Sequence, residues 1–66
     1  MRKFKIINDY EFGEDDCVTT LYDENNSIIL SGDYYHDKIN HQIEGFFHCL
    51  DYLEIQYETI SEDIND

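Results

Sequence analysis

The residues best suited to chemistry lie between positions 31 and 53, in the stretch SGDYYHDKINHQIEGFFHCLDYL. Three of them, His41, Glu44 and His48, are spaced three and four residues apart, so on a helix they would occupy adjacent turns of one face. Neutral imidazole and carboxylate groups bind divalent metal ions, but a zinc site generally takes three or four protein ligands, more than one straight helix usually presents. The simpler interpretation is a solvated face of acids and histidines. A metal-binding module built on these three residues stays open as an alternative.

A catalytic cysteine is the other chemistry to consider. Cys49 directly follows His48, so on a helix the two side chains diverge by about 100° and cannot pair as nucleophile and base. No basic residue near Cys49 in the sequence would stabilise its thiolate, and we expect it to be a buried structural cysteine. Gly13 and Gly32 are isolated, which excludes a phosphate-binding loop. The sequence therefore predicts a protein that is not an enzyme and has no cofactor.

A strip between the acidic and apolar sides of the expected helix is suited to protein contact. Its members are Tyr34, Lys38, Gly45, Cys49 and Tyr52. Glycine inside a helix costs about 1 kcal/mol relative to alanine, so Gly45 calls for a reason. Either another chain approaches here, which makes Gly45 and Cys49 an oligomer face, or the glycine relieves crowding beside Phe46 and Phe47 while the tyrosines pack at the sheet margin. In the first case the tyrosines would be amphipathic anchors for a partner.

The charge of the chain narrows the class of partner. Its 66 residues carry 16 acids and four Lys or Arg, a formal net charge of −12. Such a surface repels phosphate backbones and anionic lipids, so we expect neither direct nucleic-acid binding nor membrane binding. It suits a basic protein surface. The acids expected to bind it are Asp37, Glu44 and Asp51 of the helix and Glu14, Asp15 and Asp16 of an acidic loop.

Composition and targeting signals favour a folded cytoplasmic domain. The 41% hydrophobic content, with six Tyr and four Phe, is too high for a typical disordered chain. The apolar run at the start, in MRKFKIINDYEF, is too short for a signal peptide, and no segment reaches the length of a membrane span. Cys17 and Cys49 are expected to be free thiols in a reducing bacterial cytoplasm.

The periodicity of the sequence predicts the elements that position these residues. Alternation in RKFKIIN, residues 2–8, indicates a half-buried strand. The segments CVTTLYD and SIILS, on either side of ENN, predict a hairpin in which Asn25 and Asn26 can take positive φ angles. Alternation over 55–60 indicates a fourth short strand, followed by a frayed acidic tail at 61–66.

Between the hairpin and residue 55 the spacing becomes helical. Apolar residues recur at steps of three and four and define the expected core face: Tyr35, Ile39, Ile43, Phe46, Phe47, Leu50 and Leu53. Asp33 is the expected N-cap, and Asp37 should interact with the helix dipole. The predicted fold is a single α+β domain over 1–60 in the order β-β-β-α, with an optional last strand. Its small antiparallel sheet of three or four strands carries the helix across one face, and the fourth strand would run parallel to the third, beside the first.

The run GDYYHDKINHQIEGFFHCLDYL, preceded by a hairpin, resembles short acidic proteins encoded by phages and mobile elements of Gram-positive bacteria. Its format, over about residues 17–60, is similar to that of anti-CRISPR and other anti-defence inhibitors. The resemblance implies a non-enzymatic inhibitor that mimics DNA and occupies a basic surface of a host protein, such as a nuclease or another defence effector. A homo-oligomeric structural or regulatory phage protein is the alternative from a different class.

Overall fold

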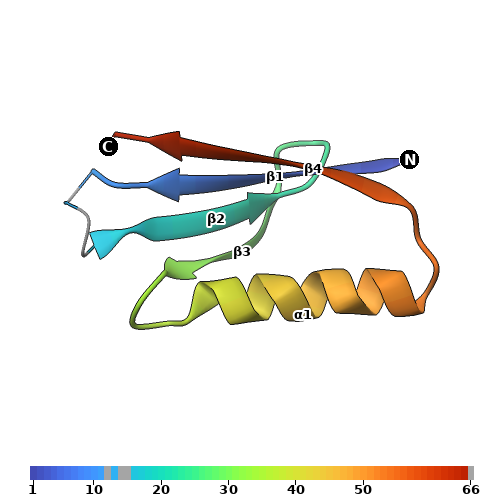
Figure 1. Cartoon of the computed structure of the whole chain (residues 1–66). Helices are drawn as coiled ribbons and strands as arrows, with labels where there is room; N and C mark the ends of the chain where they lie inside the picture. Colours follow the sequence, from blue (N-terminus) through green and yellow to red (C-terminus); the bar gives the residue numbers. More distant parts are fainter. Residues whose placement is uncertain (12, 14–15, 66) are drawn as a thin grey trace.

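The computed structural model describes residues 1–11, 13 and 16–65 and contains one sheet and one helix. In chain order the elements are β1 (Arg2–Asp9), β2 (Val18–Tyr22), β3 (Ile28–Asp33), α1 (Ile39–Tyr52) and β4 (Tyr57–Ile64). The strands lie in the order β3-β2-β1-β4, and α1 packs on the sheet (Figure 1). This is the small α+β fold that the sequence predicts, in the order β-β-β-α-β.

The sheet is mixed, because its last strand is parallel to its neighbour. β1 pairs antiparallel with β2, and β2 with β3, whereas β4 runs parallel to β1 from Arg2↔Tyr57 to Asp9↔Ile64. The fourth strand therefore lies beside the first, as expected. The prediction of a frayed tail is wrong for residues 61–64, which belong to β4; residue 66 lies outside the described residues. Pairing along all of β1 supplies hydrogen-bond partners that its edge would otherwise lack.

The core lies between the sheet and the helix. Phe4, Leu21, Ile39 and Ile43 form its buried cluster. The side chains packed against this cluster are Ile6, Ile29, Leu30, Phe46, Phe47, Leu50 and Tyr57. Phe4, only 3% exposed, has the rings of Phe46 and Phe47 edge-on at centroid distances of 5.4 and 5.6 Å. The prediction of the helix core face is thus confirmed from Ile39 to Leu50.

The two ends of the predicted core face are corrected by the bounds of the helix. Tyr35 is 55% exposed and precedes α1, while Leu53 is 62% exposed and follows it. The helix stops at Tyr52 because Glu54 takes a positive φ of 58°, and the amide of Ile55 donates to the carbonyl of Leu50 at 2.9 Å, which closes the last turn. Both side chains are therefore outside the regular face that packs on the sheet.

The start of α1 is also later than predicted, and Asp33 is not its N-cap. The Oδ1 atom of Asp33 accepts hydrogen bonds from the amides of Tyr35 and His36 at 2.8 and 2.7 Å, which builds a turn before the helix. Asp37 lies outside the first helical turn, and its Oδ2 atom accepts from the amide of Asp33 at 2.8 Å. Lys38, in the left-handed region at φ 50°, occupies the cap position. The expected interaction of Asp37 with the helix dipole is therefore replaced by a hydrogen bond within this turn.

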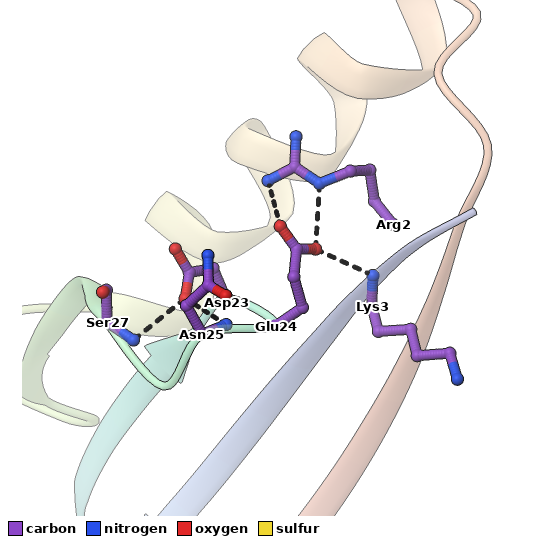
Figure 2. A network of polar contacts seen from close by, with 6 residues as sticks. All are labelled: Arg2, Lys3, Asp23, Glu24, Asn25 and Ser27. Carbon is purple, nitrogen blue, oxygen red and sulfur yellow. Dashed lines mark hydrogen bonds and ion pairs between the residues drawn. The ribbon is translucent and has the colours of Figure 1, made fainter.

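The hairpin between β2 and β3 is fixed to the start of β1. Asn26 has a positive φ of 63°, as the tight turn requires, whereas Asn25 does not. The carboxylate of Glu24 accepts from Arg2 Nε at 2.9 Å and from the amide of Lys3 at 3.2 Å, and its other oxygen lies 2.8 Å from Arg2 Nη2 (Figure 2). The hydrogen bond from Arg2 is the main cause of the lowered pKa of Glu24.

Candidate functional site

The outer surface of α1 brings together residues from the two sets that the sequence singles out. Glu44, Asp51 and Tyr52 come from the predicted partner-binding set, and Gly45 and Cys49 form the predicted oligomer face. All five are exposed on this helix, and we call them the helix docking surface. Tyr52 is 87% exposed. This surface contains two carboxylates and no Lys or Arg.

Cys49 is exposed, which corrects the prediction that it is buried; Cys17 is buried, and both are free thiols. Cys49 lies in a shallow hollow of about 380 Å³ that is lined by His48, Cys49, Tyr52 and Leu53. The hollow is almost wholly apolar although it lies on an acidic protein. Tyr52 and Leu53, both exposed, add apolar area beside Cys49.

Gly45 does not relieve crowding within the chain. A Cβ atom built at this position meets no atom of Phe47 or of any more distant side chain within 4 Å. Tyr52 is too exposed to be packed at the sheet margin, as the crowding explanation also required. The space above Gly45 is therefore open surface.

The metal-site alternative receives no support from the geometry. The closest approach within its proposed ligand set is 3.9 Å, between His48 Nε2 and Glu44 Oε1. No group of three or more His, Cys, Asp or Glu side chains able to hold a metal ion occurs in the part of the chain that the structure describes.

The remaining predicted partner residues are separate from the helix docking surface. Tyr34 and Asp37 belong to the turn that precedes α1, and Asp16 is exposed just before β2. Glu14 and Asp15 lie outside the described residues. The amide of Tyr34 donates to the carbonyl of Cys17 at 2.8 Å, which brings the turn before α1 close to the start of β2. The predicted set is thus divided between the outer surface of α1 and the region around the turn that precedes it.

A cavity of about 410 Å³ occupies this second region. Its lining residues come from the end of the sheet where β1 and β4 end and β2 begins, and Figure 1 shows this end of the sheet. We call this cavity the tyrosine cavity; its lining consists of Asn8, Tyr10, Cys17, Tyr34, Tyr35, Ser61 and Asp63. The rings of Tyr34 and Tyr35 meet edge to face at 5.1 Å. Asn8 and Asp63 are register partners, and alternation from buried Phe4 places Asn8 on the face of the sheet that carries the helix.

A chain of side-chain hydrogen bonds holds the acid of the tyrosine cavity in place. Thr19, 2% exposed, donates from Oγ1 to Asn8 Oδ1 at 2.7 Å. Asn8 then donates from Nδ2 to Asp63 Oδ1 at 2.9 Å. The pKa of Tyr10 is raised, first by burial and then by the negative charge of Asp63. Burial and the nearby carboxylate thus both favour the neutral form of the Tyr10 hydroxyl.

Most of the tyrosine cavity was not predicted from the sequence. Asn8 and Asp63 are 55 residues apart and meet only because β4 pairs with β1. One signal was present: in a meander the first and third strands point the same way, so residues that follow them lie at one end of the sheet. Tyr10 follows β1 and Tyr34 and Tyr35 follow β3, which satisfies this rule.

The positive side chains of the sheet are directed elsewhere. Lys3 and Lys5 alternate with buried Phe4 and so lie on the sheet face opposite the helix. Arg2 is held by Glu24, the one ion pair of an Arg or Lys among the described residues.

No helix in the described part of the chain has the length and apolar character needed to span a membrane. Comparisons of the chain with protein-family models, with curated proteins and with solved structures found no match.

Proposed function

We propose that this chain is a non-enzymatic inhibitor that docks on a cationic surface of a bacterial protein and blocks that surface. The observation that carries the proposal is Tyr52, which is 87% exposed beside an apolar hollow on a helix surface whose charged groups are Glu44 and Asp51. A large aromatic side chain held in water by a regular helix is available for burial by a partner.

The two kinds of group in the helix docking surface would act in different ways. The carboxylates attract a basic partner and raise the rate of encounter, an effect that salt weakens. Burial of an aromatic or leucine side chain contributes about 1.5–3 kcal/mol, so Tyr52 and Leu53 would prolong the complex once it has formed. Rates of dissociation differ among related complexes more than rates of association do.

The class of partner follows from charge and from the resemblance to small acidic phage proteins. Proteins that bind nucleic acid carry cationic surfaces, since phosphate neutralisation requires Lys and Arg. We propose a cytoplasmic nuclease or another defence effector, with the chain occupying its nucleic-acid site. The net charge of −12 supports this choice.

The test compares two double charge reversals that change the net charge equally. Tagged wild-type chain, the variant Glu44→Lys/Asp51→Lys and the control Glu58→Lys/Glu62→Lys are incubated with bacterial lysate at low and high salt. The control residues are exposed on β4, away from α1. Captured proteins are identified by mass spectrometry, purified and assayed for nucleic-acid binding with and without the chain.

The expected result is a basic protein that the wild-type and control chains capture at low salt, that the helix variant loses, and whose nucleic acid the chain displaces. Equal loss in both variants would show that net charge alone attracts the protein, and would refute a docking surface on α1. A captured protein that still binds its nucleic acid normally would refute occlusion.

A second candidate, a homo-oligomeric structural or regulatory protein, is favoured by the open space above Gly45. A second copy of α1 could approach as closely there as a foreign partner. This candidate predicts a dimer by analytical ultracentrifugation and a monomer for Gly45→Arg. A wild-type monomer across the accessible concentration range would exclude it.

A further inference from the structure

We propose that the tyrosine cavity is a cation site that receives an arginine side chain of the partner protein. The inference rests on the proposed function, since a cationic partner is required, but it concerns a different part of the chain from the helix docking surface. The chemical group that the cavity would recognise is a guanidinium on a flexible aliphatic stem.

The lining of the cavity has the composition that recognises an organic cation. Tyr10, Tyr34 and Tyr35 provide three aromatic rings, and Asp63 provides a carboxylate. Aromatic faces attract cations within about 6 Å, and a carboxylate adds charge-assisted hydrogen bonds. None of the described lining residues is Lys or Arg, so an anion would find no positive charge to offset the repulsion from Asp63. A neutral apolar group would leave the hydroxyl, amide and carboxylate groups of the lining without partners.

The carboxylate is oriented before any ligand arrives. Its Oδ1 atom accepts the hydrogen bond from Asn8, and Asn8 is itself held by the buried hydroxyl of Thr19. A carboxylate has about four lone-pair sites, so the bond from Asn8 leaves sites for a ligand. A fixed carboxylate loses less conformational entropy on binding than a mobile one, which favours affinity.

Arginine fits this arrangement better than lysine. A planar guanidinium stacks on aromatic rings and donates in a fork to a carboxylate, whereas an ammonium is a compact and strongly hydrated charge. The volume of about 410 Å³ accommodates the head group and part of its stem. The interaction with tyrosine faces is also made more often by arginine in known structures.

The position of the cavity accounts for partner residues that the helix docking surface leaves out. Tyr34 lines it, and Asp16 is adjacent in sequence to the lining residue Cys17. The 14-residue helix spans about 20 Å. One protein interface of standard size, about 800 Å² on each side, is wide enough to cover both regions.

The site is tested with small probes, so that no protein partner is needed. The ¹⁵N-labelled chain is titrated with N-acetyl-arginine methylamide, with the lysine analogue, and with the citrulline analogue, which has nearly the same shape and no charge. Spectra follow the backbone amides of Tyr10, Tyr35 and Asp63 and the side-chain amide of Asn8. Asp63→Asn keeps an acceptor for Asn8 but removes the charge. Glu62→Gln, its neighbour on β4, makes the same change in net charge on the opposite face of the sheet.

The arginine probe should shift these signals with a dissociation constant of roughly 1–10 mM, and the lysine probe should bind about threefold more weakly. Asp63→Asn should weaken arginine binding about tenfold, while Glu62→Gln leaves it unchanged. Equal shifts with citrulline, equal losses in the two variants, or no localised shifts would each overturn the proposal. A tighter lysine complex would overturn the assignment to arginine. The comparison of the arginine and citrulline probes uses the wild-type chain. It therefore tests whether the cavity recognises a cation even if Asp63→Asn fails to fold.

Capture from lysate separates this inference from the proposed function. If the cavity is wrong but the docking surface is right, wild-type chain captures its basic protein while the arginine probe gives no localised shifts. If the docking surface is wrong but the cavity is right, the probe result holds while Glu44→Lys/Asp51→Lys captures as well as wild type.

Discussion

Replacement of Gly45 by alanine separates a structural role of this glycine from a role in docking. Alanine is more favourable than glycine inside a helix by about 0.8–1.0 kcal/mol. The added Cβ meets nothing within 4 Å, and Gly45 does not have the positive φ found at Gly13. No steric cost therefore offsets the gain in helix propensity, and Gly45→Ala should raise the free energy of unfolding by nearly the full amount.

An increase of this size is easily measured in so short a chain. Domains of 66 residues have stabilities of about 3–10 kcal/mol, and 1 kcal/mol shifts the midpoint of thermal unfolding by about 4–8 °C. Circular dichroism during thermal and urea unfolding provides both values. Gly32→Ala is the comparison, because a Cβ there would lie 3.0 Å from Asp37 Oδ2, the atom that accepts the amide hydrogen of Asp33. That variant should be destabilised.

Binding to the captured partner should change in the opposite direction from stability. A methyl group on the helix docking surface separates the helix from any backbone seated on Gly45, so Gly45→Ala should bind more weakly although it is more stable. A destabilised Gly45→Ala would refute the reasoning from open space and restore crowding as the explanation. Greater stability with undiminished binding would remove Gly45 from the interface.

Four further predictions concern the core, the charges and the thiols. Phe4→Ala should cost about 3–5 kcal/mol, because the 3% exposed ring contacts three other aromatic rings, and should leave the chain largely unfolded by circular dichroism. The pKa of Glu24 is lower in the folded chain than in the unfolded chain. The ionised carboxylate therefore stabilises the fold fully above its unfolded pKa, and this contribution is lost as the pH falls through the folded pKa. Arg2→Met should reduce this dependence of the free energy of unfolding on acid pH, as measured by urea titrations. Raising NaCl from about 0.02 to 0.5 M should increase the thermal midpoint, by screening the net charge of −12, while it weakens the partner complex. A thiol reagent should modify Cys49 rapidly in the native chain and Cys17 only after unfolding, and equal rates would contradict the burial described above.

The strands whose residues alternate between buried and exposed could be predicted from the sequence. The predicted bounds of β4, which lacks this alternation, ended too early. Phe4 and Leu21 lie in two-residue patterns with buried and exposed sides, and both are in the core. From Ser61 to Ile64, β4 is exposed throughout, because it is an edge strand beyond the area that the helix covers. An exposed edge strand has no buried side, so its sequence need not alternate between apolar and polar residues. The acidic residues in this segment therefore led to the prediction of a tail instead of a strand. Its pairing depends on β1, which is more than 50 residues away in the sequence.

The start of the helix was mispredicted because two local solutions compete for the same residues. Asp33 has the chemistry of an N-cap, and in the structure it does accept backbone hydrogen bonds from the two residues Tyr35 and His36. Asp37 accepts the amide of Asp33 in return, which closes a separate turn, and Lys38 then reverses the sign of φ before α1 begins. Asp and Asn side chains favour both caps and turns for the same reason, so composition alone cannot choose between them.

The placement of polar residues on the helix-facing side of the sheet supports the proposal that one end of this small fold binds a ligand. On that face, Phe4 and Leu21 give way to Asn8 and Thr19 as β1 and β2 are followed toward the tyrosine cavity. Apolar residues at these positions would extend the core and add stability that a chain of 66 residues with a net charge of −12 lacks. A polar network that is fully hydrogen-bonded can be kept in such a place at modest cost, and departures from an apolar core are expected at functional sites. The apolar core beneath α1 is therefore interrupted at one end of the sheet, where Asp63 and three tyrosines line the proposed cation site.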